Sequence, residues 1–226
     1  MIKEDILKNM YLAGSAYSQT QADVFGGGVR VIDDSESGIQ CFLRRDGGTL
    51  YITFRGSDSP KDWQTNLYFR RLVIPYGNTK SKIRMHAGFI YAYNNDRVRP
   101  QLHSAAKNTD KIVISGHSLG AALSIVCAVD IQYNFPEKDI EVYAYGGPRV
   151  GNLAFIRSYN KRVFKTFRVE NGNDIVTKLP PAIFGYRHAG IKVHVGQMRL
   201  PLVFSFNQHR PENYAKNIIR DFYNTS

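Results

Sequence analysis

The sequence predicts an α/β fold: a mostly parallel central sheet with antiparallel N-terminal strands and helices on both faces. From residue 111 onward, short β-branched runs alternate with helical patterns, which is typical of parallel strands joined by crossover helices. Before residue 55, three strand-like runs follow one another with short turns between them, which indicates an antiparallel meander. The 226 residues, of which 43% are hydrophobic, suffice for one buried core, so we expect a single domain over residues 1–226.

The N-terminal half begins with an amphipathic helix pattern and continues into the meander. The helical spacing is carried by Ile2, Ile6, Leu7, Met10 and Tyr11. Strands are expected at 28–32, 39–44 and 49–54. A segment at 67–74 and a polar loop at 76–82 then lead into one predicted helix over 88–107.

In the C-terminal half the expected elements alternate. They are a strand and a helix around residue 118, strands at 140–145, 163–169 and 191–195, and helices at 152–159 and 212–223. No apolar run approaches the roughly 20 residues that span a bilayer, and the first residues lack the apolar stretch of a signal peptide. We therefore expect no membrane span and no signal peptide in the sequence as given, and a cytoplasmic or unknown location. Export by another route and a leader that has been removed are the alternatives.

Residues 111–122, KIVISGHSLGAA, carry the most specific local pattern. An apolar β-branched run breaks into G-H-S-L-G at 116–120 and continues as an Ala-rich helix pattern. Such a turn presents its serine at the positive end of a helix dipole, and its glycines let strand and helix approach closely. The pattern predicts Ser118 as a nucleophile, and the simpler alternative is a glycine-rich turn in which Ser118 caps the helix.

A serine nucleophile needs a general base, and after a strand–serine–helix turn the base is a histidine further along the chain. His86 and His103 precede Ser118 and His117 adjoins it, which leaves three candidates. They are His188, His194 and His209. His194 lies in a strand-like run and His188 at its entry, whereas His209 lies in a polar loop that can reach a cleft, so we predict His209 as the base.

Asp174 is the predicted acid that orients the base. It ends the loop 170–174 after a strand-like run, and α/β folds place functional loops at the carboxyl ends of strands. Glu170 is the nearest alternative, and an aspartate in an Asn-Gly loop can also be only a turn former. Asp130 and Asp139 fit less well, because one lies on the helix after Ser118 and the other begins a strand.

An acyl-transfer site also needs donors for the oxyanion. The backbone N–H of Leu119 follows the nucleophile and is one candidate. Ser57 is the other, because it follows the strand 50–55 and Gly56, and both its N–H and its hydroxyl can donate. The alternative for residues 56–60 is an ordinary turn and helix cap.

These residues and several further segments resemble the class 3 lipases, meaning the fungal-type triacylglycerol lipases with their feruloyl esterase and phospholipase relatives. The shared segments run in family order over about residues 50–215. They are T-F-R-G-S at 53–57 with D-W at 62–63, H-A-G-F at 86–89, G-H-S-L-G at 116–120, G-P-R-V-G-N at 147–152, N-D-I-V at 173–176 with L-P-P at 179–181, and Y-R-H-A-G at 186–190.

The resemblance implies an α/β-hydrolase fold and assigns a role to each candidate. Ser118 would be the nucleophile, Asp174 the acid and His209 the base, with Ser57 and Leu119 as oxyanion donors. It implies a serine hydrolase acting on carboxylic esters, a lipase that hydrolyses acylglycerols through an acyl-enzyme. A phospholipase A1 and a short-chain or feruloyl-type esterase are the alternatives, because they share this machinery.

Relatives carry an amphipathic lid where this chain has residues 57–66. Here the segment is short and mostly polar, so Trp63 either belongs to a lid that meets substrate or anchors the loop by packing. The apolar loops at 180–184 and 201–206 flank Asp174 and His209. They either line an acyl pocket or belong to the core.

No metal or organic cofactor is expected, because no His/Cys spacing typical of a metal site occurs. Cys41 and Cys127 both lie in apolar runs and are expected to be buried free thiols.

The net charge of +11 and the pI near 9.6 favour partners of negative charge. Contact with anionic lipid surfaces follows if the basic clusters at 44–45, 70–71, 80–84 and 161–168 share a face with the active site. A basic binding module without catalysis is the alternative from another class, either a degenerate hydrolase or a nucleic-acid-binding protein. We expect no specific nucleic acid partner, because no recognition motif is present. The sequence leaves the oligomeric state open.

Overall fold

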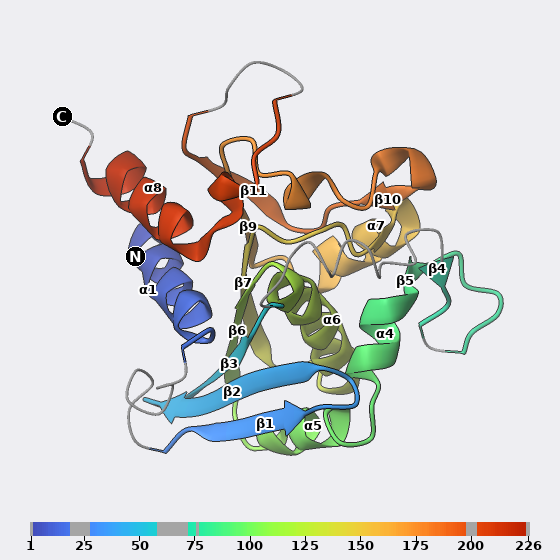
Figure 1. The fold of residues 1–226 in the computed structure, drawn as a ribbon. Helices are drawn as coiled ribbons and strands as arrows, with labels where there is room; N and C mark the ends of the chain where they lie inside the picture. The colour runs from blue at the N-terminus through green and yellow to red at the C-terminus, as the bar shows by residue number, and fades with distance from the viewer. Residues whose placement is uncertain (1, 19–27, 58–71, 76, 198–202, 225–226) are drawn as a thin grey trace.

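The computed structural model describes residues 2–18, 28–57, 72–75, 77–197 and 203–224. Its central sheet has the strand order β1-β2-β3-β6-β7-β9-β11 (Figure 1). The strands are β1 Arg30–Asp34, β2 Ile39–Asp46, β3 Thr49–Phe54, β6 Lys111–His117, β7 Asp139–Tyr145, β9 Thr166–Asn171 and β11 Ile191–Val195. β1, β2 and β3 are antiparallel neighbours, whereas every neighbouring pair from β3 to β11 is parallel. The predicted fold class is confirmed.

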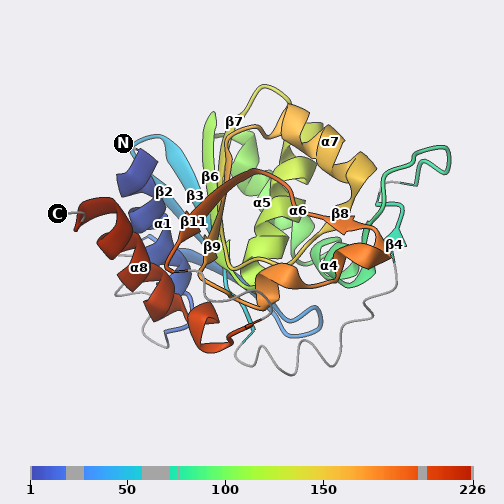
Figure 2. The ribbon, with the colours of Figure 1, turned by 90° about the horizontal axis from the view of Figure 1, so that it is seen from above.

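Helices cover both faces of this sheet, as Figure 2 shows. α1 and α8 lie on one face, and α4 to α7 lie on the other. The bounds are α1 Ile2–Ser15, α4 Ala87–Tyr93, α5 Arg99–Lys107, α6 Leu119–Asn134, α7 Leu153–Arg162 and α8 Pro211–Tyr223. α6 is apolar on nearly all sides and is therefore buried against the sheet, whereas α8 turns one apolar face inward.

The prediction of one helix over residues 88–107 is wrong, because the structure has two helices, α4 and α5, with residues 94–98 between them. Asn94 and Asn95 favour a turn. Pro100 has no N–H, and its ring would clash with a carbonyl four residues earlier in a continuous helix. At the beginning of α5 the proline is tolerated, because the first N–H groups of a helix have no intrahelical acceptor.

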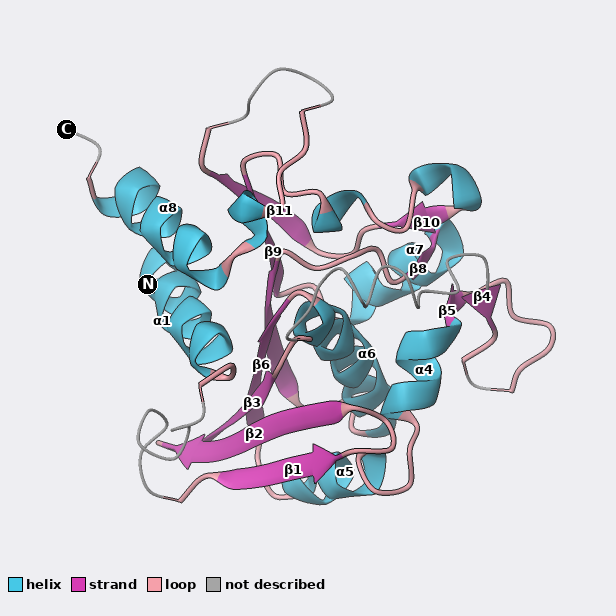
Figure 3. Cartoon of the chain, viewed as in Figure 1, coloured by secondary structure: helices cyan, strands magenta, loops and turns pink. Residues whose placement is uncertain are grey.

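A second, smaller sheet of two-residue strands escaped prediction, because such strands are too short to show an alternating pattern (Figure 3). Its strands are β4 Leu72–Val73, β5 Met85–His86, β8 Gly151–Asn152 and β10 Tyr186–Arg187. Three 3₁₀ turns complete the described elements, η1 Val176–Lys178, η2 Ala182–Phe184 and η3 Asn207–His209. β9 begins three residues later than predicted, because Val163 ends α7 instead of opening the strand.

The topology brings the loops after β6, β7 and β9 to one edge of the sheet, since parallel strands share the direction of their carboxyl ends. Ser118 follows β6, Gly146 follows β7 and Asp174 follows β9 by three residues. The Gly146 N–H donates to the Val169 carbonyl, at 3.0 Å, which joins the beginning of the loop after β7 to β9. This edge carries the candidate site.

Cys41 and Cys127 are buried and free, as predicted. Burial raises the pKa of both thiols. Within the described ranges, no helix is both long enough and apolar enough to cross a bilayer.

A buried carboxylate joins α4, α5 and α6. Asp130, on α6, accepts hydrogen bonds from the Tyr93 hydroxyl at 3.0 Å, from Arg99 at 2.9 Å and from His103 Nε2 at 2.6 Å. Burial alone would raise the pKa of Asp130, but the hydrogen bonds from His103 and Arg99 hold it below its ordinary value. The three partners therefore stabilise the folded state through one ionised group.

We expect Asp130→Ala to lower the free energy of unfolding by about 3 kcal/mol, because it leaves several donors around an empty site. Urea unfolding followed by circular dichroism measures this. Asp110→Ala is the matched control, since the Asp110 side chain is fully exposed and its loss should cost less than about 0.5 kcal/mol. Equal losses in the two variants would contradict the role of Asp130.

Candidate active site

Ser118 lies in a strained turn between β6 and α6. Its φ of 59° and ψ of −124° make it the sole non-glycine residue of positive φ in the described chain, and its N–H donates to the Tyr145 carbonyl at 2.9 Å. A Cβ on Gly116 would collide with the Gly120 carbonyl, and one on Gly120 with the Phe54 carbonyl. Glycine at both positions therefore permits the close approach of β6, α6 and β3. The Ser118 side chain makes no capping bond to the helix, so the alternative that it serves as a cap is wrong.

The structure brings Ser118, His209 and Asp174 into one hydrogen-bonded chain. His209 Nε2 lies 2.8 Å from Ser118 Oγ, and His209 Nδ1 lies 2.8 Å from Asp174 Oδ2. A carboxylate oxygen can only accept, so the imidazole proton is on Nδ1 and Nε2 accepts from the serine hydroxyl. All three side chains are at most 3% exposed. This is the arrangement of a nucleophile, a base and an orienting acid.

Asp174 has partners that the sequence did not reveal. The Tyr214 hydroxyl, on α8, donates to Asp174 Oδ2 at 2.6 Å, and the Val176 N–H donates to Oδ1 at 2.9 Å. Burial, together with the neighbouring Asp174 carboxylate, raises the pKa of Tyr214 well above its ordinary value, so this hydroxyl remains a donor. No local pattern marks Tyr214, because it lies 40 positions from its partner in an ordinary amphipathic helix.

The loop that carries His209 is held at the end of β9. The Asn171 side-chain amide donates to the Gln208 carbonyl at 2.8 Å, and the Asn173 N–H donates to Gln208 Oε1 at 2.6 Å. Ser205 forms an isolated parallel bridge with Asp174. The segments before His209 and around Asp174 therefore run side by side.

The alternative histidines lie elsewhere. His188 Nε2 donates to the Thr177 carbonyl at 2.7 Å, and burial lowers the pKa of His188 to about 3. His194 lies on β11, opposite Glu170 in the strand register.

The alternative carboxylates also have other partners. Burial alone would raise the pKa of Glu170, but Arg168 and Lys178 lower it to about 2. Glu170 forms ion pairs with Arg168, Lys178 and Lys192, and Asp130 lies in the helix network described above.

The oxyanion candidates lie at the same turn. Leu119 begins α6, where the first N–H groups have no intrahelical acceptor. Ser57 follows Gly56, and a Cβ on Gly56 would lie 2.7 Å from the His117 carbonyl. The end of β3 is therefore packed against the turn that holds Ser118. The further turn at 58–60, suggested as an alternative, lies outside the described residues.

Trp63 also lies outside the described residues. Membership of the core is one of the two alternatives for the loops at 180–184 and 201–206. This alternative is wrong for the large apolar residues of these loops that the structure describes. These side chains are exposed, namely Ile183, Phe184, Val203, Phe204 and Phe206. The 203–206 segment lies beside Asp174, because Ser205 bridges that residue, and residues 182–184 form η2 next to β10. Burial in the core does not account for these exposed side chains.

Among the described residues, no group of three or more His, Cys, Asp or Glu side chains is arranged to hold a metal ion. The hydrogen-bonded chain described above consists of side chains alone.

Gly146 packs beneath the hydrogen-bonded chain, with a φ of 59°. A Cβ there would lie 3.0 Å from Asp174 Oδ2, His209 Nδ1 and the Tyr214 hydroxyl. We expect Gly146→Ala to slow modification of Ser118 by a p-nitrophenyl phosphonate by at least about tenfold, because the added methyl group displaces the His209 imidazole. The measurement is the pseudo-first-order rate of p-nitrophenol release.

Gly14→Ala is the control for Gly146→Ala, because a Cβ at this helical position meets only ordinary contacts, at 3.7 Å and beyond. A Gly146→Ala variant that reacts as fast as Gly14→Ala would show that the site tolerates the added methyl group.

Comparison with known proteins agrees with this geometry. A family model described as Lipase (class 3) matches residues 51–184. The chain is 32% identical over 161 residues to the secreted mono- and diacylglycerol lipase 1 of Fusarium solani. The match covers 68% of this chain and 46% of that protein. It is also 32% identical over 179 residues to the chloroplastic phospholipase A(1) DAD1 of Arabidopsis thaliana, and this match covers 71% of this chain and 39% of that protein.

A solved triacylglycerol lipase, whose catalytic centre is formed by a serine protease triad, has a similar fold. The TM-score is 0.74 at 27% identity, and the match covers 84% of this chain and 79% of that one. The chain spans less than half the length of the two sequence relatives. Because the family match covers more than half of the chain, the protein belongs to the class 3 lipases and has their α/β-hydrolase fold.

Proposed function

We propose that this protein is a serine carboxylic-ester hydrolase of the lipase type that acts on acylglycerols. The observation that carries the proposal is the buried hydrogen-bonded chain from Ser118 through His209 to Asp174 in a member of the class 3 lipase family. A serine hydroxyl is a weak nucleophile alone, and a base at hydrogen-bond distance activates it.

In the acylation step, Ser118 Oγ attacks the ester carbonyl carbon while His209 Nε2 takes the hydroxyl proton. The carbonyl oxygen becomes an oxyanion and accepts hydrogen bonds from the Leu119 N–H and from Ser57. The bond from carbon to the alcohol oxygen then breaks, and His209 returns its proton to that oxygen. Water repeats the sequence on the acyl-enzyme, which releases the carboxylic acid and restores Ser118.

Asp174 stabilises the imidazolium that forms on His209 and fixes the ring orientation. Tyr214 and the Val176 N–H hold the carboxylate from two sides, so Asp174 meets His209 in one orientation. The proton therefore passes between Ser118, His209 and the leaving alcohol, and Asp174 stays ionised.

The named activities of the relatives support acyl esters of glycerol as the substrate class. Phospholipid hydrolysis is the second candidate, because a phospholipase A(1) is among the relatives and the chain is strongly basic. The two candidates use the same chemical steps and differ in the head group that the site accepts.

We expect Ser118→Ala to lower the turnover of p-nitrophenyl esters by at least about 10⁴-fold, because no other group can form the acyl-enzyme. The assay compares acyl lengths below and above the concentration at which each ester aggregates. Long-chain preference with a rise in rate on aggregation supports a lipase, and short-chain preference supports an esterase. Equal turnover by the wild type and Ser118→Ala would exclude the proposed function.

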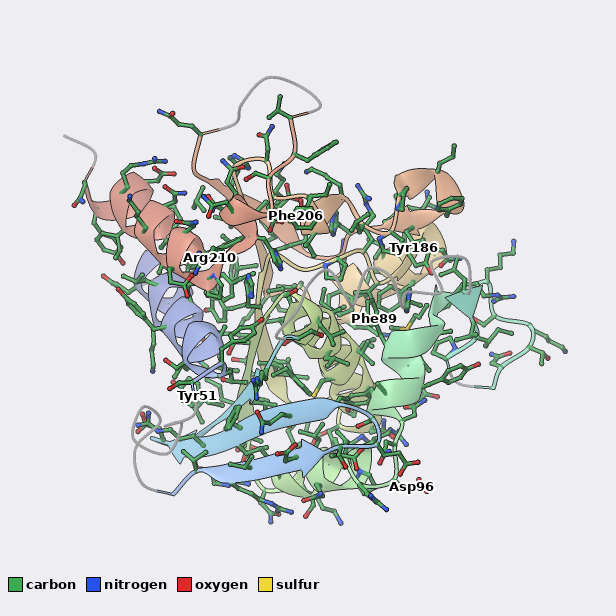
Figure 4. All side chains as sticks on the ribbon, viewed as in Figure 1. Tyr51, Phe89, Asp96, Tyr186, Phe206 and Arg210 are labelled. Atoms are coloured by element: carbon green, nitrogen blue, oxygen red, sulfur yellow. The ribbon has the colours of Figure 1, made fainter. Side chains whose placement is uncertain are left out.

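A lipid surface is the proposed partner of the edge that carries the site. The 182–184 and 203–206 segments carry five exposed apolar side chains, and Ile183 is 87% exposed. The 203–206 segment is bridged to Asp174 through Ser205, and the 182–184 segment forms η2 next to β10. Phe206 and Arg210 flank η3 and are labelled in Figure 4. Exposed apolar side chains grouped at one site are typical of an interaction surface.

The basic residues of this edge differ from those expected. Arg44 and Arg45 lie at the opposite end of the sheet, because Arg45 pairs with Leu50 near the beginning of β3, and Lys165 precedes β9 at the same end. Residues 70–71 lie outside the described chain. Arg187 donates to the Ala182 carbonyl at 2.8 Å, and Arg210 follows His209 and pairs with Glu212. A cationic group next to an exposed apolar segment favours a surface of anionic lipid.

We expect the double variant Ile183→Ser/Phe204→Ser to bind vesicles of mixed phosphatidylglycerol and phosphatidylcholine at least about tenfold more weakly, because two apolar side chains no longer insert. Vesicle sedimentation measures the binding. Phe164→Ser is the control, since Phe164 is 66% exposed but precedes β9 at the far end of the sheet. Equal binding by the wild type, the double variant and Phe164→Ser would show that the lipid contact lies elsewhere.

A further inference from the structure

We propose that Tyr17 and His117 are positioning residues for His209, so that the segment after α1 takes part in aligning the base. This inference rests on the proposed function. Neither residue touches the reacting atoms in the mechanism above. His117 is instead hydrogen-bonded to the backbone that carries the imidazole, and Tyr17 is hydrogen-bonded to His117.

His117 contacts His209 in two ways. Its Nε2 lies 2.6 Å from the His209 backbone carbonyl, and its ring centroid lies 4.5 Å from that of His209 with the ring planes 33° apart. His117 precedes Ser118 directly and is 2% exposed. The nucleophile and the base are therefore joined through one side chain as well as through their own hydrogen bond.

Tyr17 completes the link from the other side. Its hydroxyl lies 2.9 Å from His117 Nδ1, across 100 positions of sequence, and its ring packs against the edge of the His117 ring at 5.8 Å. The same hydroxyl lies against Gly56, where a Cβ would collide with it. Tyr17 thus lies next to both the base-positioning histidine and the strand end that leads to Ser57.

These contacts define the protonation state of His117. The His209 carbonyl can only accept, so His117 carries its proton on Nε2, and Nδ1 accepts from the Tyr17 hydroxyl. Removal of that hydroxyl would leave Nδ1 without this donor and allow the other tautomer. In the other tautomer a lone pair on Nε2 would face the carbonyl of His209, and the hydrogen bond would be lost.

The neutral state of His117 also suits the reaction. When His209 accepts the proton of Ser118, a second positive charge at 4.5 Å would oppose it. Burial and the neighbouring His209 lower the pKa of His117 well below its ordinary value. His117 therefore holds the backbone of the base without competing for the proton.

The position of the His209 backbone matters because its imidazole must reach two atoms at once. Both distances are 2.8 Å, to Ser118 Oγ and to Asp174 Oδ2. A displacement of the carbonyl tilts the ring away from one of these atoms. Misplacement of a catalytic group by about 1 Å can cost on the order of 100-fold in rate, so a hydrogen bond to this carbonyl bears on turnover.

The test compares Tyr17→Phe with Tyr159→Phe. Tyr159 is also buried, and its hydroxyl also makes a hydrogen bond of 2.9 Å, to Thr166 Oγ1 between α7 and β9. Active sites are counted by p-nitrophenyl phosphonate titration to completion, and kcat per titrated site is measured with a soluble p-nitrophenyl ester. We expect Tyr17→Phe to lower kcat by at least about tenfold with KM within about twofold, and Tyr159→Phe to keep the wild-type kcat.

A double-mutant cycle with His117→Phe, which keeps an aromatic ring but loses both hydrogen bonds, tests the link itself. We expect the double variant to be no slower than His117→Phe alone, because Tyr17 acts through His117. An unchanged kcat per site in Tyr17→Phe, or additive losses in the cycle, would overturn the positioning role. An inactive wild type would instead overturn the proposed function, so the two failures are distinguishable.

Discussion

The close packing of three backbones around Ser118 is the constraint on which the rest of the structure depends. β3, β6 and α6 meet where Gly116 and Gly120 leave no space for a side chain, and Ser118 adopts a positive φ between them. Because the Ser118 hydroxyl makes no capping bond to α6, it is available to the imidazole of a distant segment. The same turn begins α6, so Ser118 and the Leu119 N–H come from one local structure.

Buried hydrogen bonds from distant segments then fix the remaining groups. β9 leads to Asp174, η3 ends at His209, and α8 contributes the Tyr214 hydroxyl. In surroundings of low polarity these bonds are stronger than in water, and an unsatisfied group is more costly. The Tyr145 hydroxyl donates to the Ile6 carbonyl at 2.5 Å and thereby links β7 to α1, and α1 packs against α8. Elements near both ends of the described chain therefore affect the geometry around Ser118.

The residues that local patterns mark could be predicted, and those that only long-range contacts define could not. Ser118 sits in a glycine turn, and Asp174 and His209 lie in polar loops whose chain order limits the choice. The structure brings these three together, whereas their chemical roles stay predictions. Tyr17 and Tyr214 are unremarkable tyrosines in sequence, because their contacts span 100 and 40 positions. The mostly parallel sheet with its antiparallel beginning was likewise predictable from the alternation of strands and helices, but two-residue strands are too short to show a periodic pattern.

The two ends of the parallel strands differ in chemistry, and this difference accounts for where function is expected. At the amino ends, charges of opposite sign lie together, with Lys111 3.2 Å from Glu141 and Lys165 2.6 Å from Asp139. At the carboxyl ends, the charges of the site are buried and hydrogen-bonded, while exposed apolar side chains such as Phe206 lie in the segment that leads to His209. An exposed apolar side chain gains free energy only when a partner removes it from water. The carboxyl edge is therefore suited to an apolar or amphipathic partner, and the amino edge to water.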